Sequence, residues 1–286
     1  MASRNGQLNG RGNGHRAAID TRAALDQALR VTEAAGVIAR LSDEFAQGAT
    51  SQVRSLDDAL TGLNEMAASL GETASQATTI AGSTDQLVYL QVTRGVAMRD
   101  HVMPPDIEPT VFMMATPMKP ATAEQRHQGV ACVTARDFRW ERGDIKSISL
   151  LGNVLARQMS ADHGAAETIM LRDGWLTEAA ASNVWIVQEG ALLGPPKSEV
   201  VLEGIRYDLL KELCEEEGIA YNLRPISEAD LFAADEVMLS SATKEVLPVT
   251  RIDGDEVGHG ALRGKPGPVY ARLFEAYQRA KLAQAI

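Results

Sequence analysis

Lys146 is the residue whose type and surroundings most directly suggest covalent chemistry. It lies in residues 142–154, Arg-Gly-Asp-Ile-Lys-Ser-Ile-Ser-Leu-Leu-Gly-Asn-Val, between a strand-like and a helix-like segment. In such a setting we expect the ammonium to be partly desolvated, and desolvation favours the neutral amine. A neutral lysine amine can attack an aldehyde and form a Schiff base. The alternative is a lysine whose stem packs while its head reaches water.

Three other stretches carry polar residues in a definite order around this lysine. They are Tyr-Leu-Gln-Val-Thr-Arg-Gly-Val-Ala-Met-Arg-Asp-His (89–101), Leu-Thr-Glu-Ala-Ala-Ala-Ser-Asn-Val-Trp-Ile-Val (176–187) and Ser-Ser-Ala-Thr-Lys-Glu-Val-Leu-Pro-Val (240–249). Together with the lysine stretch they resemble the class IV pyridoxal-phosphate aminotransferases, and within them the D-amino-acid (D-alanine) aminotransferases. The resemblance covers about residues 87–286.

The resemblance implies a pyridoxal 5′-phosphate cofactor and assigns roles to three residues. Lys146 is similar to the catalytic Schiff-base lysine, which also moves the substrate proton. Glu178 resembles the glutamate that faces the pyridine nitrogen and keeps it cationic. Arg139 matches an arginine near the cofactor, although alone it could equally belong to a structural ion pair.

The phosphate of that cofactor requires backbone N–H groups and hydroxyls at a turn or helix start. Ile205 and Arg206 resemble one phosphate-binding turn of the family, and Ser241, Ala242 and Thr243 resemble the second. Relatives often carry threonine at the positions of Ala242 and Arg206, so the hydroxyl that binds the phosphate stays open.

Arg99 and His101 resemble the pair that binds the substrate α-carboxylate in D-amino-acid aminotransferases. An arginine offers two parallel donors to a carboxylate. In the family a neighbouring subunit lends this pair, which implies a homodimer. The pair favours D-amino acids over branched-chain L-amino acids as substrates.

The function that follows is transamination between a D-amino acid such as D-alanine and a 2-oxo acid such as 2-oxoglutarate. One alternative is a catalytically impaired fusion protein whose helical segment self-associates. Another is aminodeoxychorismate lyase or branched-chain aminotransferase activity, which the same lysine and glutamate would serve.

Composition limits the other classes of function. The 286 residues suffice for two domains. A net charge of −10 argues against nucleic acid as a partner. Cys132 and Cys214 lack metal-ligand spacing, so no metal site is predicted, and their apolar neighbours predict buried thiols. No long apolar run or signal-peptide pattern is seen, so we expect a cytoplasmic protein without membrane contact.

The chain is expected to have four parts. Residues 1–19 read as a disordered tail. Residues 20–86 read as a helical, coiled-coil-like segment, similar over 56–86 to the methyl-accepting chemotaxis receptors. Residues 87–120 are interpreted as the remnant of an aminotransferase small domain with a linker, and residues 121–286 as the cofactor-binding large domain.

The expected fold class is α+β, a fold-type IV large domain with a truncated small domain behind a coiled-coil-like segment. Alternation and turn residues predict strands and helices of a mixed sheet rather than a doubly wound one. The predicted strands are 88–93, 110–116, 129–134, 167–172, 183–188 and 236–240, and the predicted helices are 150–163, 205–217 and 266–285.

Overall fold

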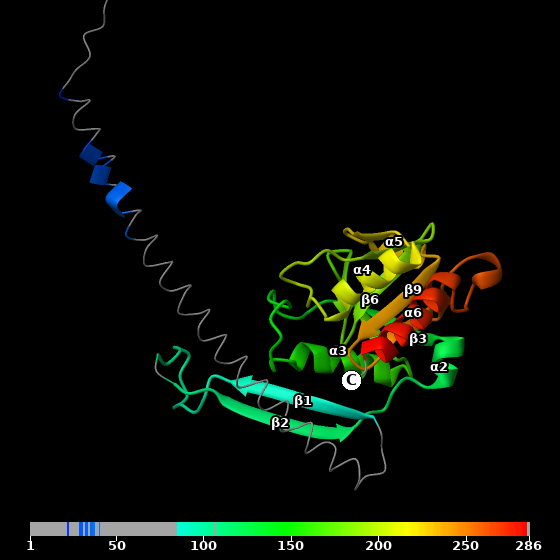
Figure 1. Cartoon of the computed structure of the whole chain (residues 1–286), viewed down its shortest axis with the longest axis horizontal. Coiled ribbons are helices and arrows are strands. Elements are labelled where there is room, and N and C mark those ends of the chain that lie inside the picture. Colours follow the sequence, from blue (N-terminus) through cyan, green and yellow to red (C-terminus); the bar gives the residue numbers. More distant parts are fainter. Residues whose placement is uncertain are drawn as a thin grey trace, which may run out of the picture. The chain divides into compact units, whose positions relative to one another are not determined.

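The computed structural model describes residues 22, 29–30, 32–33, 35–37, 40, 85–105 and 107–284. The chain divides into two compact units, residues 1–115 and 116–286, whose elements are labelled in Figure 1. The predicted tail lies outside the described residues. Of the predicted helical segment, the few described positions between 22 and 40 are helical. The coiled-coil interpretation and the four-part division therefore stay predictions.

The described part of the first unit centres on a two-stranded sheet of β1 (Gln86–Thr93) and β2 (Thr110–Pro117). Both strands were predicted. The rings of Tyr89 and Phe112 meet edge to face across it, 6.4 Å apart. The connecting loop turns at Gly95, where φ is +118° and a Cβ would lie 2.0 Å from the Glu108 carbonyl oxygen. Only glycine fits this turn.

The second unit is built on a mixed sheet whose nine described strands follow the order β5-β4-β3-β10-β9-β6-β7-β8, with β11 paired to β10. Three neighbouring pairs are parallel, namely β3–β4, β3–β10 and β7–β8. The strands are β3 (Val130–Arg136), β4 (Glu167–Arg172), β5 (Trp175–Ala179), β6 (Asn183–Gln188), β7 (Ala191–Gly194), β8 (Tyr221–Leu223), β9 (Glu236–Ser241), β10 (Glu245–Ile252) and β11 (Asp255–Glu256). The α+β fold class is thereby confirmed.

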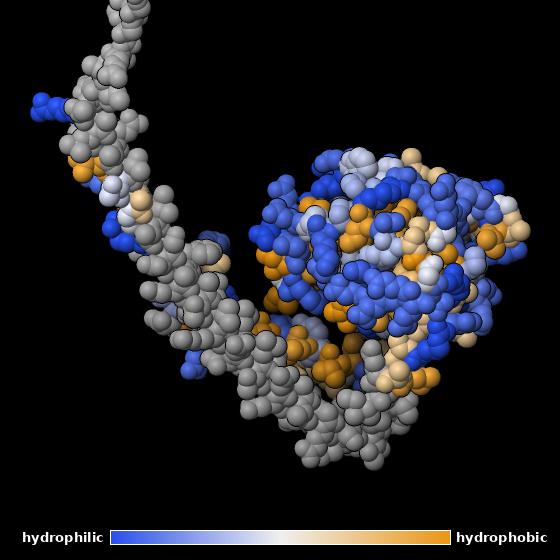
Figure 2. Space-filling model, turned by 45° about the horizontal axis from the view of Figure 1, so that its top comes forward, coloured by the Kyte–Doolittle hydropathy of each residue, from blue (hydrophilic) through white to orange (hydrophobic). Residues whose placement is uncertain are grey.

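Helices cover this sheet at several places. They are α2 (Ala123–Gln128), α3 (Leu151–Asp162), α4 (Arg206–Glu217), α5 (Glu228–Phe232), α6 (Pro268–Gln284) and a 3-10 turn, η1 (Gly260–Leu262). Helix α3 packs on β3 and β4, whereas α4 and α6 pack on each other and α6 also contacts β9 and β10. No helix in the described ranges is both long and apolar enough to cross a membrane. Polar residues predominate on the face of the second unit in Figure 2, and apolar residues form separate patches.

Two apolar clusters lie on opposite faces of the sheet, because successive strand residues point in opposite directions. On β6, Val184 and Ile186 belong to one cluster and Trp185 and Val187 to the other. The second cluster includes buried side chains of α4 and α6. Each central strand is therefore buried on both faces.

Tight turns join several of the antiparallel strands. Asp173-Gly174 joins β4 to β5, Glu189-Gly190 joins β6 to β7, and Asp253-Gly254 joins β10 to β11. Both residues of each pair have positive φ, between 51° and 90°. Turns with two residues of positive φ have a backbone twist that matches the twist of the two strands of a hairpin.

The cysteines behave as predicted. Cys132 on β3 and Cys214 on α4 are free and buried. Burial raises the pKa of the Cys132 thiol, and it raises the pKa of the Cys214 thiol to about 12.

Candidate active site

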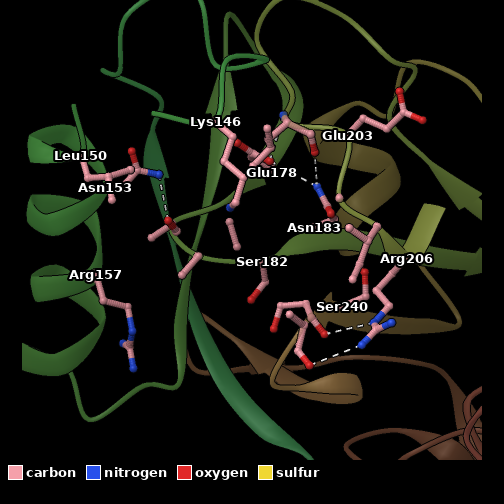
Figure 3. Close-up of a pocket in the computed structure, with 18 of the residues that line it drawn as sticks. Lys146, Leu150, Asn153, Arg157, Glu178, Ser182, Asn183, Glu203, Arg206 and Ser240 are labelled. Atoms are coloured by element: carbon pink, nitrogen blue, oxygen red, sulfur yellow. Dashed lines mark hydrogen bonds between the residues drawn. The ribbon is translucent and has the colours of Figure 1, made fainter. Parts of the chain in front are cut away.

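A cavity of about 770 Å³ opens in the second unit. Its walls come from the loop before α3, from α3 itself, from the segment joining β5 to β6, from the start of α4, and from the β9–β10 turn. Figure 3 shows its polar side chains converging from these elements. Segments far apart in the sequence thus meet in one space of ordinary ligand-binding size.

Glu178 lies on β5 at the buried wall of this cavity, 6% exposed. Its Oε1 pairs with Arg139. Its Oε2 accepts hydrogen bonds from Asn183 Nδ2 and from the Leu202 backbone N–H, both at 3.2 Å. Burial raises the pKa of the Glu178 carboxyl to about 7, although Arg139 acts in the opposite direction. Because burial disfavours the charged carboxylate even beside Arg139, Glu178 would bind a further cation inside the cavity favourably.

Arg139 lies behind Glu178, and the residues that line the cavity do not include it. Its guanidinium also donates to both Asp137 carboxylate oxygens, at 3.0 and 2.9 Å, and to the Val200 carbonyl at 3.1 Å. Burial acts to lower the pKa of Arg139, but Asp137 and Glu178 raise it overall. Arg139 therefore orients Glu178, and its predicted contact with the cofactor stays a prediction.

Lys146 lies in the loop between β3 and α3 and lines the cavity, where Figure 3 shows it beside Glu178. The side chain is exposed, so the expected partial desolvation of its ammonium is wrong for the single chain. The physical reason is its place on a loop at the open side of the cavity, where water reaches it. The shared cavity of Lys146 and Glu178 nevertheless brings together two residues 32 positions apart.

Lys244 is the other lysine near this region, and its environment differs. Its Nζ lies 3.0 Å from Oε2 of Glu167, whose side chain is 0% exposed. This ion pair ties the Lys244 ammonium to Glu167, and Lys244 is not among the residues that line the cavity. Among the described residues that line the cavity, Lys146 is the only lysine.

The start of α4 forms another wall, through Gly204, Ile205 and Arg206. A Cβ on Gly204 would lie 2.2 Å from Asn183 Oδ1, so a side chain there would have to displace the Asn183 amide. Ile205 is the N-cap residue of α4, and no side chain caps this end of the helix. A helix start of this kind favours an anion because its N–H groups and dipole point outward.

The β9–β10 turn faces the start of α4. Arg206 joins the two, since its guanidinium donates to the Ser241 and Ala242 carbonyls at 3.5 and 3.4 Å and lies over the Tyr277 ring. Of the three residues predicted to bind the phosphate at this turn, Ser241 and Ala242 line the cavity, whereas Thr243 is not among the lining residues. The reason is local, because the chain turns away after Ala242 into β10.

Several lining residues were not predicted. Ser240 precedes the predicted Ser241, and its Oγ accepts a hydrogen bond from Trp185 Nε1 at 2.9 Å. Asn153 and Arg157 line the cavity from α3. The neighbouring Ser241 was a signal in the sequence that could have identified Ser240. No sequence pattern distinguished Asn153 and Arg157 from the polar residues of an ordinary exposed helix face.

Arg99 and His101 lie in the loop between β1 and β2 of the first unit, and both are exposed. The Asp100 carboxylate accepts a hydrogen bond from the His101 backbone N–H at 2.6 Å. Their predicted role toward a substrate carboxylate stays a prediction.

The sequence profile of the family described as amino-transferase class IV matches residues 54–252 of this chain. The chain belongs to the class IV aminotransferases. The match begins within the segment that was interpreted as a coiled coil, and it includes Lys146, Glu178 and both turns of the cavity.

Individual relatives agree with this family. A D-alanine aminotransferase of Bacillus licheniformis is 39% identical over 197 residues, which are 69% of this chain and 68% of the relative. One from Staphylococcus haemolyticus is 38% identical over 193 residues, 67% of each chain. The class IV chain thus spans about two thirds of the length of these relatives.

Solved structures agree on the fold. The branched-chain amino acid aminotransferase of Escherichia coli superposes with a TM-score of 0.62 at 26% identity, over 76% of this chain and 71% of that one. A second branched-chain amino acid aminotransferase, solved with pyridoxamine 5′-phosphate, gives a TM-score of 0.64 at 24% identity, over 73% of this chain and 69% of that one. The likeness to this second structure concerns the fold alone.

The cofactor of class IV aminotransferases is pyridoxal phosphate, and the cavity fits it. The buried Glu178 carboxylate, with its pKa raised to about 7, is complementary to a protonated ring nitrogen. The start of α4, Arg206 and the hydroxyls of Ser240 and Ser241 are complementary to a phosphate. Lys146 provides an amine for the aldehyde.

Proposed function

We propose that the chain is a pyridoxal-phosphate aminotransferase that transfers the amino group of a D-amino acid such as D-alanine to a 2-oxo acid such as 2-oxoglutarate. The observation that carries the proposal is the single cavity lined by both Lys146 and Glu178. The relatives named D-alanine aminotransferase support the choice of substrate.

Bound pyridoxal phosphate supplies an aldehyde that binds amines and a ring that accepts electrons from the substrate Cα. The Lys146 amine would hold the cofactor through its aldehyde and, when free, would accept the proton from Cα of the amino donor. The Glu178 carboxylate, which Arg139 and Asn183 fix in place, would keep a proton on the ring nitrogen. The start of α4 and the Ser241–Ala242 turn would bind the phosphate.

Binding of the substrate α-carboxylate is proposed for Arg99 and His101 of a neighbouring subunit. An arginine with a second donor beside it suits a carboxylate. The exposed apolar side chains of α3 and the loop before it support a homodimer, since an apolar face of this kind is typical of an interface. They include Ile148 (65% exposed), Leu151 (71%) and Leu155 (51%).

The dimer has a direct test. Leu151→Glu introduces a charge on that face without touching the residues that line the cavity. We expect light scattering to give a dimer for the wild-type protein and a monomer for the variant. Glu216→Gln, on the exposed side of α4, is the matched control. A wild-type monomer at working concentrations would contradict the dimer.

The activity is tested with the purified full chain and added pyridoxal phosphate. Mixed with D-alanine and 2-oxoglutarate, the wild-type protein should release pyruvate, and Lys146→Ala should not. L-alanine and L-leucine are the matched donors that separate the D-specific from the branched-chain reaction. Turnover of L-leucine but not of D-alanine would reject the proposed substrate, and cofactor binding without turnover of any donor would favour the impaired fusion protein.

A further inference from the structure

The ion pair of Glu167 and Lys244 is not used by the roles assigned above. Glu167 begins β4 and its side chain is fully buried, whereas Lys244 lies in the β9–β10 turn with its side chain 21% exposed. Removing a carboxylate from water is unfavourable unless a cation and hydrogen bonds compensate it. Lys244 supplies that cation at 3.0 Å.

Two hydroxyls connect this pair to the cavity. Ser182 Oγ donates to the same Glu167 oxygen at 3.1 Å, and Ser182 lines the cavity. The Lys244 backbone N–H donates to Ser241 Oγ at 3.1 Å, and Ser241 lines the cavity from the opposite segment. The ion pair thus connects the β5–β6 segment to the β9–β10 turn, whose Ser241 carbonyl accepts a hydrogen bond from Arg206.

The charges matter because a phosphate monoester carries about −1.5 to −2 charges at neutral pH. An unbalanced Glu167 carboxylate next to this turn would repel such an anion across a poorly screened interior. With Lys244 in place the pair is neutral, and Arg206 adds a positive charge at the same turn. Ala242 carries no hydroxyl, whereas Arg206 carries a charge at the same turn, so charge has a large part in binding a phosphate here.

We propose that Lys244 is a positioning residue for the cofactor phosphate, which neutralises Glu167 and fixes the Ser241–Ala242 turn through its backbone. The proposal rests on the proposed function, because it takes pyridoxal phosphate as the occupant of the cavity. It concerns how tightly the phosphate binds and leaves the covalent role to Lys146.

Charge-changing variants separate this role from a structural one. Lys244→Met leaves an unpaired carboxylate and should weaken cofactor binding about tenfold or more, as expected for an unbalanced neighbouring charge. Glu167→Gln leaves an unpaired ammonium and should bind the cofactor at least as tightly as wild type. The double variant is neutral again and should bind within about threefold of wild type, since the two charges are removed together. A purely structural contact would instead weaken binding in both single variants.

The experiment measures binding by the cofactor-free full chain, with pyridoxal phosphate and with inorganic phosphate as two separate probes. Tryptophan fluorescence gives the affinity and circular dichroism gives the folded state. Lys211→Met, an exposed lysine of α4, is the matched control and should bind as wild type. Lys244→Arg keeps the charge and should retain binding of both probes.

The outcomes distinguish the two proposals. A wild-type chain that binds neither probe rejects the proposed function. A wild-type chain that binds, with Lys244→Met binding equally well or Glu167→Gln weakened to the same degree, overturns the role of Lys244 alone. If Lys244→Met does not fold, Glu167→Gln and the double variant carry the test, and binding by either of them that is more than about threefold weaker than wild type would overturn the proposal.

Discussion

The strongest quantitative prediction concerns Glu178→Gln in the cofactor-free protein. Burial raises the pKa of this carboxyl from 4.5 to about 7, so the folded protein binds the proton more tightly than the unfolded chain. The protonated form therefore stabilises the fold, fully below about pH 4.5, and this contribution is lost as the pH rises through about 7. At about 1.36 kcal/mol per pH unit, the loss amounts to about 3 kcal/mol between acid and alkaline pH.

Glutamine carries no charge at any pH, so the stability of the variant should lack this pH dependence. The free energy of unfolding is measured by urea unfolding at pH 5 and pH 8.5. Tryptophan fluorescence follows the unfolding of the second unit, because all three tryptophans, at 140, 175 and 185, lie in it. The free energy of unfolding of wild type relative to the variant should fall by about 2.5 kcal/mol from pH 5 to pH 8.5, since part of the effect is already lost at pH 5. Glu212→Gln, an exposed change on α4, is the control. Parallel behaviour of wild type and Glu178→Gln at both pH values would refute the argument.

Four further results are expected. Lys146→Ala should lose covalent cofactor attachment, and borohydride reduction with peptide mapping should label Lys146 in the wild type; a label elsewhere rejects the assignment. Gly204→Ala should reduce cofactor affinity in the fluorescence titration, since its Cβ would lie 2.2 Å from Asn183 Oδ1. Arg99→Ala should weaken the apparent affinity for D-alanine by about 2–4 kcal/mol, the worth of charge-assisted contacts, and an unchanged KM would exclude that contact. The fragment 87–286 should bind cofactor no worse than the full chain; loss of binding would give residues 1–86 an active part.

The sequence predicted four of the nine described strands of the large sheet, namely β3, β4, β6 and β9, because hydrophobic runs and Asp-Gly or Glu-Gly turns are local signals. It did not predict β5, β7, β8, β10 or β11. Of these, β10 contains Pro248 and begins at Glu245 with a φ of +59°. β10 is paired with β9 at Pro248, but its pairing with β3 starts only at Val249. On the β3 side of the strand, no ladder partner therefore requires an N–H from residue 248.

The site was predictable in part for a similar reason. Lys146 and Glu178 stand in sequence motifs that resemble those of one family. The sequence alone therefore assigned both residues to one cofactor site. The position of Arg139 between Asp137 and Glu178 depends on how two strands and a loop pack, and no local pattern encodes it. The exposure of Lys146 depends likewise on what surrounds the loop in three dimensions.

The burial of both native thiols makes the folded protein a clean background for site-specific labelling. The chain contains two cysteines, and both have pKa values raised by burial, so a thiol reagent at neutral pH should react slowly with either. A cysteine introduced at an exposed position, such as His101→Cys, would therefore take up a single fluorophore. Energy transfer from that fluorophore to bound pyridoxal phosphate would report how close the β1–β2 loop comes to the occupied cavity.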